Sequence, residues 1–307
     1  MRSAFSDTLV DLALADPKLL LLTGDHGYAL FDEFRRRCPD QFINAGIAEQ
    51  NMVGMAAGLA RVGYRPFVYA LAAFVPIRAV EQIKLDIAHD NLPVVLIGDG
   101  AGFVYSHLGS SHQSTEDVAC TRAIPGMTIL SPADSFEMKA SMQFAYEEEC
   151  PVYLRVGKAD LGNVHTRYLD TLKPGRLLKV REGNEKKLGL IATGSMVQVA
   201  LQVGEELDLT VWSAPIIKPL STESILLAAK DRTGLVTLEE HSVLAGLGGT
   251  IAEIVSQYNP IPILRLGVKD KFSVFCGTYK YLLEEHELDI HSIRKQVLDF
   301  SNHIDSH

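Results

Sequence analysis

Residues 42–60 read FINAGIAEQNMVGMAAGLA, an apolar strand followed by a helix of small residues with one carboxylate, Glu49, in its first turn. The ordinary explanation is that this glutamate complements the helix dipole, which is worth roughly 0.3–1 kcal/mol. Gly54 and Gly58 weaken that explanation, because each glycine inside a helix costs about 1 kcal/mol relative to alanine. We therefore expect a partner helix or a flat ligand to approach this backbone closely. A carboxylate buried there needs a partner, and a ligand nitrogen that shares its proton would serve.

Apolar strands alternate with helices on both sides of this stretch. In the first half, strands are predicted at 19–23, 41–44, 66–71, 93–98, 127–130 and 151–156, with helices at 49–62, 74–89 and 134–149. In the second half, strands are predicted at 188–193, 209–213, 234–238 and 262–266, with a closing helix at 286–300. Strands that are apolar on both faces are typical of a parallel sheet covered by helices. The sequence predicts an α/β protein with two open-sheet domains in tandem, at 1–160 and 188–307, joined by a linker at 161–187.

The 307-residue chain has a formal net charge of -9 and no long run of lysine and arginine, which argues against nucleic acid and anionic membranes as partners. Its apolar runs are too short to span a membrane. Asp7 and Asp11 interrupt the first apolar stretch, so no signal peptide is expected. The cysteines are scattered at Cys38, Cys120, Cys150 and Cys276. Such spacing predicts reduced thiols, and therefore a cytoplasmic protein without a disulfide frame or a zinc site.

A long loop, GDGAGFVYSHLGSSHQS at 98–114, follows the strand at 93–98. Ligands of open α/β sheets bind where strands end. A loop longer than about 12 residues without regular structure is usually functional or disordered, so an ordinary mobile loop is the alternative. His107 and His112 in this loop lack the third ligand that a metal site needs. Arg155, at the end of another strand, is either an ordinary strand-end cation or a group that holds a phosphate or carboxylate.

The stretch GIAEQNMVGMAAGLA at 46–60, together with the loop that ends in Ser111-His112-Gln113, resembles the thiamine-diphosphate enzymes of the transketolase family. GLIATGSMVQVAL at 189–201 and VTLEEHSVLAGLGGTIAEIV at 236–255 resemble that family's third domain. The resemblance is to the carboxyl-terminal half of those enzymes and covers nearly the whole chain. It implies a pyrimidine-binding domain for thiamine diphosphate, followed by a transketolase C-terminal domain.

The resemblance implies roles for the residues that meet the cofactor. Glu49 matches the glutamate that contacts N1′ of the aminopyrimidine and promotes its imino tautomer, whose nitrogen takes the proton from thiazolium C2. Phe74 matches an aromatic residue that packs on the pyrimidine ring, with a plain core phenylalanine as the alternative. Asp25 and Ile47 lie near the places where the family has further cofactor contacts.

The resemblance also implies which residues meet the substrate. His112 matches a histidine that faces the substrate and the reacting cofactor atom, and it is the second catalytic candidate beside Glu49. Arg155 matches an arginine that binds the acceptor's phosphate in transketolases. Further substrate contacts are expected from His26, His107, Ser111 and Gln113.

The chain departs from the family pattern in three places. The amino-terminal domain that binds the diphosphate and Mg²⁺ is missing, and although Gly98-Asp99-Gly100 opens like its motif, no asparagine follows through Leu130. We therefore expect one subunit of a split enzyme, inactive alone and paired with a separate diphosphate-binding transketolase subunit in an α2β2 tetramer. No metal ligand is predicted in this chain, because the partner would hold most of the diphosphate and the Mg²⁺. Leu108 lies near the place of an acidic residue that reads a sugar hydroxyl, and Gly100 near a phosphate-binding histidine. These two changes leave a modified or non-phosphorylated sugar open as the substrate.

The predicted function is transfer of a two-carbon ketol unit from a ketose or ketose phosphate to an aldose through thiamine diphosphate. Two other reactions of this cofactor stay open: an acyloin condensation from pyruvate like that of deoxyxylulose-phosphate synthase, and the β subunit of a 2-oxo acid dehydrogenase. The dehydrogenase fits the split chain but fits the Ser111-His112-Gln113 loop poorly. A non-catalytic scaffold is a further alternative, against which the presence of both Glu49 and His112 argues.

Overall fold

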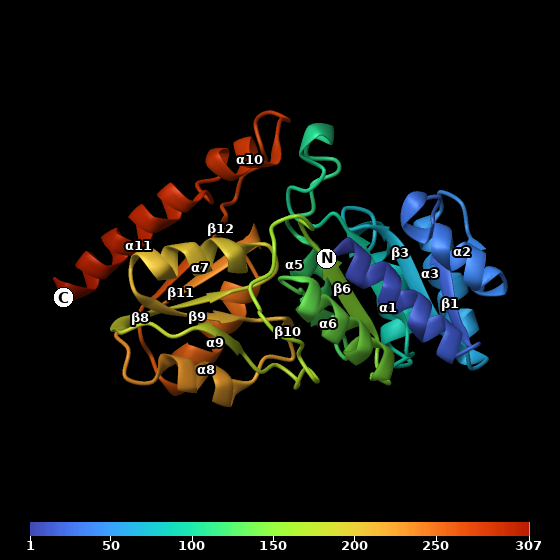
Figure 1. Ribbon diagram of the computed structural model, residues 1–307, viewed down its shortest axis with the longest axis horizontal. Coiled ribbons are helices and arrows are strands. Elements are labelled where there is room, and N and C mark those ends of the chain that lie inside the picture. The colour runs from blue at the N-terminus through green and yellow to red at the C-terminus, as the bar shows by residue number, and fades with distance from the viewer. Residues whose placement is uncertain (307) are drawn as a thin grey trace.

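The structure, a computed structural model, describes residues 1–306 and contains two α/β units side by side (Figure 1). The strands of the first unit are β1 (Leu19–Thr23), β2 (Phe42–Asn44), β3 (Arg65–Leu71), β4 (Val95–Asp99), β5 (Thr128–Leu130) and β6 (Val152–Val156). Its helices are α1 (Arg2–Ala15), α2 (Asp32–Arg37), α3 (Glu49–Arg61), α4 (Val80–Gln82), α5 (Asp117–Arg122) and α6 (Ser135–Glu147). Short helical turns are η1 (Ala29–Phe31), η2 (Pro39–Gln41), η3 (Ile77–Ala79), η4 (Ile83–Ala88) and η5 (Ser106–Leu108).

The second unit follows the same plan. Its strands are β7 (Leu178–Arg181), β8 (Glu185–Ala192), β9 (Leu209–Ser213), β10 (Ile216–Lys218), β11 (Gly234–Ser242) and β12 (Ile263–Val268). Its helices are α7 (Met196–Glu206), α8 (Thr222–Ala229), α9 (Leu247–Tyr258), α10 (Tyr279–Glu285) and α11 (Ile290–Asp305). Its sheet has the order β12-β11-β8-β9-β7, in which β7 is antiparallel to β9 and the other pairs are parallel.

The first sheet has the order β10-β5-β6-β4-β3-β1-β2, and β1 to β6 pair in parallel. The edge strand β10 comes from the second half of the chain and pairs antiparallel with β5, so the two units share a sheet edge. The predicted α/β fold with two open sheets in tandem is confirmed. The sheets are mixed because each gains one antiparallel edge strand.

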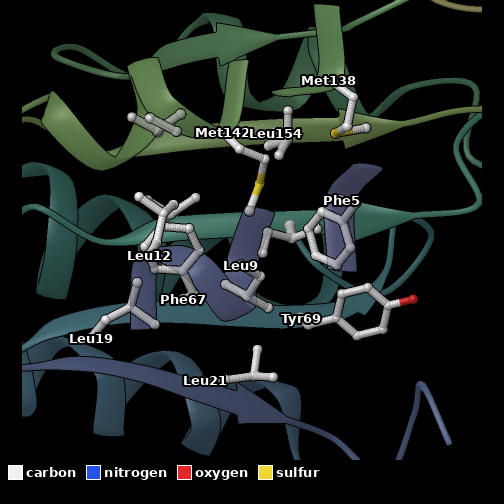
Figure 2. Packing of buried hydrophobic residues seen from close by; sticks show 14 of the residues in the cluster. Phe5, Leu9, Leu12, Leu19, Leu21, Phe67, Tyr69, Met138, Met142 and Leu154 are labelled. Atoms are coloured by element: carbon white, nitrogen blue, oxygen red, sulfur yellow. The ribbon is translucent and has the colours of Figure 1, made fainter. Parts of the chain in front are cut away.

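Helices cover both faces of the first sheet because the side chains of a strand alternate between its faces. Leu19 and Leu21 of β1 face a cluster formed with α1 and α6, whereas Leu20 and Leu22 face α3. Figure 2 shows the first cluster, in which α1 contributes Phe5, Leu9 and Leu12 and α6 contributes Met138 and Met142. The run of leucines at 19–22 in β1 is therefore explained by burial on two sides.

The structure departs from the predicted elements in several places. The helix expected at 74–89 is divided into η3, α4 and the π-type turn η4, and Phe74 precedes them in a turn closed by its N–H to the Leu71 carbonyl, at 2.8 Å. The closing helix begins at Ile290 because His286 ends α10 instead. Helix α1 was not predicted, because no strand precedes it in the sequence. β7 and the first residues of β8 lie within the segment expected to be a linker.

Within residues 1–306, no helix combines the length and the apolar character that crossing a membrane requires.

Candidate active site

Three neighbouring strands bring the candidate residues to one edge of the first sheet. β1, β3 and β4 are parallel, so their carboxyl ends meet at the same edge. The loop after β1 carries His26, the turn after β3 carries Phe74, and the loop after β4 carries His112. Glu49 joins them as the first residue of α3, which follows the neighbouring strand β2.

Glu49 is buried and incompletely paired. Its side chain is only 6% exposed, and its Oε2 lies 3.6 Å from Nη1 of Arg78, which is itself half-exposed. Its Oε1 is buried without a hydrogen-bond partner among the described residues. A buried oxygen without a partner costs free energy, commonly about 1–3 kcal/mol, so native proteins rarely leave one. The carboxylate is therefore placed to accept a hydrogen bond from a ligand.

Phe74 is the centre of a group of rings next to Glu49. The ring of His112 meets it edge-on, with 5.3 Å between centroids, and the ring of His26 lies 6.5 Å away. The guanidinium carbon of Arg78 lies 3.7 Å from the centre of the Phe74 ring. Arg78 thus pairs with the carboxylate and also covers the aromatic ring.

The loop that carries His112 is fixed at its base. The N–H groups of Gly102 and Ser114 each donate to the carbonyl of the other, at 2.8 and 3.0 Å. Within the loop, the N–H of His112 donates to the Gly109 carbonyl at 3.0 Å. Nδ1 of His112 lies 3.0 Å from Oγ of Ser111, so its Nε2 is the nitrogen left for a ligand.

The remaining expected contacts lie at different depths. Ile47 is 76% exposed beside the start of α3, and His107 is exposed at the tip of the loop in η5. Asp25 is exposed and accepts a hydrogen bond from Asn44 at 3.2 Å. Gln113 is buried, and its Oε1 accepts a hydrogen bond from Ser273 in the second unit. The side chain of Gln113 is thus engaged by the second unit instead of facing the rings around Phe74.

Arg155 requires a correction. It is 2% exposed, and its Nε donates to Oδ2 of Asp117 at 2.8 Å. Its Nη2 donates to the carbonyls of Ser114 and Glu240, at 3.2 and 2.7 Å. A guanidinium with these internal partners has no room for a phosphate. The residue links the two units, and the strand-end position in the sequence could not show that its partners come from elsewhere in the chain.

Sequence reasoning missed Arg78. The available signal was its spacing: Arg78 follows Phe74 by four residues, which places two side chains on one face where the chain turns helically. Asp99, by contrast, has local partners, since Tyr105 donates to its carboxylate at 2.7 Å and Arg2 lies 3.5 Å away.

Comparison with known proteins identifies the domain family of each unit. Residues 1–163 match the family model of the transketolase pyrimidine-binding domain, and residues 175–293 match that of the transketolase C-terminal domain. The chain is 34% identical over 305 residues to one of the subunits of the apulose-4-phosphate transketolase of Phocaeicola vulgatus, covering 97% of this chain and 96% of that protein. It is 33% identical over 294 residues to the 6-deoxy-6-sulfo-D-fructose transketolase subunit SqwH of Clostridium sp., covering 94% and 90%.

A solved structure shares the whole fold. It is described as a split gene transketolase in an inactive beta4 tetramer, and it superimposes with a TM-score of 0.87 at 34% identity, covering 97% of this chain and 96% of that one. The chain therefore belongs to the transketolase family and carries its pyrimidine-binding and C-terminal domains, as the subunits of split transketolases that it matches along nearly their whole length do.

The transketolase family depends on thiamine diphosphate, and the residues at this edge fit one end of that cofactor. The unpartnered Oε1 of Glu49 can accept a hydrogen bond from a ring nitrogen, and Phe74 offers an aromatic ring, one face of which the Arg78 guanidinium covers in this structure. The diphosphate end of the cofactor, which binds a metal ion, has no such match. Within the described part of the chain, no group of three or more His, Cys, Asp and Glu side chains could hold a metal ion.

Proposed function

We propose that this chain is the subunit of a split transketolase that supplies Glu49 and His112 to the transfer of a two-carbon ketol unit between sugars. The observation that carries the proposal is the buried Oε1 of Glu49, which has no partner among the described residues. The same carboxylate pairs with Arg78, whose guanidinium covers the Phe74 ring that His112 meets edge-on. When bound, thiamine diphosphate supplies the stabilised carbanion chemistry that breaks and forms the carbon–carbon bond.

The chain's own residues orient the cofactor and move protons. Glu49 holds a proton at the ring nitrogen of the aminopyrimidine, because its buried carboxylate lacks any other donor at Oε1. Phe74 packs on the flat ring. His112, with Nδ1 turned to Ser111, uses Nε2 to hold or move a proton at the substrate's oxygen. His26 lies close enough to the same group of rings to contact the substrate.

A separate chain would supply the rest of the site. A side chain at Gly54 or Gly58 of α3 would meet nothing within 4 Å among residues 1–306, so no contact that the structure describes explains the two glycines. The small residues next to Glu49 are thus suited to an approach from outside. We place there a diphosphate-binding transketolase subunit that holds Mg²⁺, in an α2β2 assembly.

The names of the two relatives bear on the class of substrate. The two named relatives act, by their names, on apulose 4-phosphate and on 6-deoxy-6-sulfo-D-fructose, which are modified sugars with an anionic group. We propose a ketose of this kind as donor and an aldose as acceptor. Because Arg155 is engaged internally, the anionic group would be met by other residues. The four cysteines are free thiols, which supports a reducing, cytoplasmic location.

The test uses the assembled enzyme. This chain is co-expressed with a diphosphate-binding subunit, loaded with thiamine diphosphate and Mg²⁺, and offered ketoses, ketose phosphates, sulfo-sugars and pyruvate with mixed aldehydes. Products that gain a two-carbon ketol unit in the wild type, with turnover at least about a hundredfold lower in Glu49→Gln, are expected. Carbon dioxide released from pyruvate without ketol transfer would contradict the proposal and favour the acyloin or dehydrogenase alternatives.

A further inference from the structure

The second unit reaches the residue next to His112. Oγ of Ser273, in the loop between β12 and α10, donates to Oε1 of Gln113 at 2.8 Å. The same Oγ lies 2.9 Å from Nε2 of His286, at the end of α10. Gln113 directly follows His112 in the chain. In Figure 1 the loop that carries these two residues rises between the units, beside α10.

The chemistry of the three groups fixes the direction of both hydrogen bonds. A serine hydroxyl has one proton, so when it donates to Gln113 it must accept from His286. His286 therefore carries its proton on Nε2, and its buried Nδ1 has no partner among the described residues. Burial lowers the pKa of His286, although the negative field of Glu285 opposes this shift. The imidazole ring is therefore neutral at neutral pH. His286 thus donates a hydrogen bond to Ser273, and Ser273 donates one to Gln113.

Packing holds the imidazole in place. The ring of His286 is 2% exposed and stacks on Phe103, with centroids 4.8 Å apart and 23° between planes. Phe103 belongs to the same loop as His112, and its N–H donates to the buried carboxylate of Glu240 at 2.6 Å. The neighbouring Gly102 has a φ of +68°, and a side chain there would come within 2.2 Å of that carboxylate. The loop is therefore pressed against the second unit at its base as well.

We propose that Ser273 and His286 are positioning residues for catalysis: the C-terminal domain sets the place of His112 by holding Gln113 through this chain of hydrogen bonds. The proposal rests on the proposed function only for the part that His112 plays at the substrate. It assigns the C-terminal domain a role in the active site that neither residue's position in the sequence reveals. A movement of about 1 Å in a catalytic group can lower the rate as much as a hundredfold. The hydrogen bonds of Ser273 and His286 can therefore affect the rate by fixing the position of His112.

The first test measures the loop itself and needs no substrate. Hydrogen–deuterium exchange is followed in the assembled, cofactor-loaded enzyme for the amides of residues 104–114. Ser273→Ala removes the hydroxyl, Ser273→Thr keeps it, and Ser256→Ala, on the exposed side of α9, is the matched control. We expect at least about fivefold faster exchange in Ser273→Ala, since one net hydrogen bond is worth about 1 kcal/mol. Exchange in Ser273→Thr and Ser256→Ala should match the wild type.

The second test measures turnover in the same variants. Ser273→Ala should lower kcat about five- to tenfold while the dissociation constant of the cofactor stays unchanged, and Ser273→Thr should restore kcat. His286→Phe keeps the stack on Phe103 but removes the donor, so it should behave like Ser273→Ala. The proposal is overturned if exchange in Ser273→Ala equals that of Ser256→Ala, or if exchange rises while kcat does not fall. If the wild type transfers no ketol unit, the proposed function fails. The exchange result still decides whether Ser273 holds the loop in place.

Discussion

At the scale of single residues, the site keeps a group that stability alone would not select. Glu49 is buried, yet one of its oxygens lacks a partner and the other has only a half-exposed arginine at 3.6 Å. Glu137 is equally buried but fully satisfied, since Ala133 donates to one oxygen and His165 contacts the other at 2.7 and 2.8 Å. The two glutamates differ in what surrounds them, and such contrasts mark functional positions.

This contrast gives the first prediction. Glu49→Leu removes a buried, unpartnered oxygen, so the free energy of unfolding of the isolated chain should stay the same or rise by about 1 kcal/mol, while turnover of the assembled enzyme is lost. Glu137→Leu leaves two hydrogen-bond donors without an acceptor and should lower the free energy of unfolding by about 2 kcal/mol or more. Urea unfolding measures both. A large loss of stability in Glu49→Leu would show that the carboxylate is structural.

Arg78 gives the second prediction. Its guanidinium lies over one face of the Phe74 ring, and a flat cofactor ring that packs on that face has to displace it. Arg78→Met should therefore lower the dissociation constant of thiamine diphosphate about three- to tenfold in the assembled enzyme, because contacts of this kind are worth about 1 kcal/mol at partly exposed sites. Titration calorimetry measures the constant, with Arg61→Met as the control. Weaker binding in Arg78→Met would instead make Arg78 a cofactor ligand.

At the scale of elements, β6 is tied to the second unit by a buried ion pair. Arg155 of β6 pairs with Asp117 at the start of α5 and donates to the Glu240 carbonyl of β11. Arg155→Met leaves the Asp117 carboxylate buried without its cation, which should lower the free energy of unfolding by about 3 kcal/mol or more. Arg294→Met, which breaks the exposed pair with Glu206, should cost under about 1 kcal/mol. Equal effects in urea unfolding would refute the structural assignment.

The elements that the sequence predicts best are those with the simplest physical pattern. Strands such as Val95–Asp99 are buried on both faces, and their apolar runs are visible without any partner. The edge strands β7 and β10 are short, antiparallel and dependent on distant partners, so nothing local reveals them. The same limit holds in the site: Glu49 and Phe74 lie in recognisable segments, whereas Ser273 and His286 act only after the second unit folds against the loop.

At the scale of the whole molecule, the junction between the units is sensitive to acid. His241 of β11 is buried, and burial lowers its pKa to about 4. Its Nε2 accepts a hydrogen bond from the Ala119 N–H in the first unit at 3.2 Å, and its Nδ1 lies 2.8 Å from the Ser242 carbonyl. Asp117 and Glu239 lie 3.9 and 3.7 Å away without overcoming the burial. Protonation of Nε2 would break the contact between the units.

The sign of the pH dependence follows. Because the pKa is about 4 in the folded state and about 6.5 when unfolded, His241 stabilises the fold fully above pH 6.5, and that stability is lost as the pH falls towards 4. In His241→Gln, the drop in the free energy of unfolding between pH 7 and pH 4.5 should be smaller by about 2 kcal/mol. His291→Gln, exposed on α11, is the control. An unchanged drop in His241→Gln would show that other groups govern the acid response.

The central claim is that Glu49 and His112 serve ketol transfer in an assembly of two kinds of chain. The most direct measurement gives the loaded complex a ketose donor labelled with ¹³C at carbons 1 and 2, together with an unlabelled aldose, and follows the label by NMR. The account predicts that both labelled carbons appear together at positions 1 and 2 of a longer ketose, and that the complex built with Glu49→Gln lacks this product. Label that stays in the donor, when the partner chain is in place and the cofactor is loaded, would contradict it.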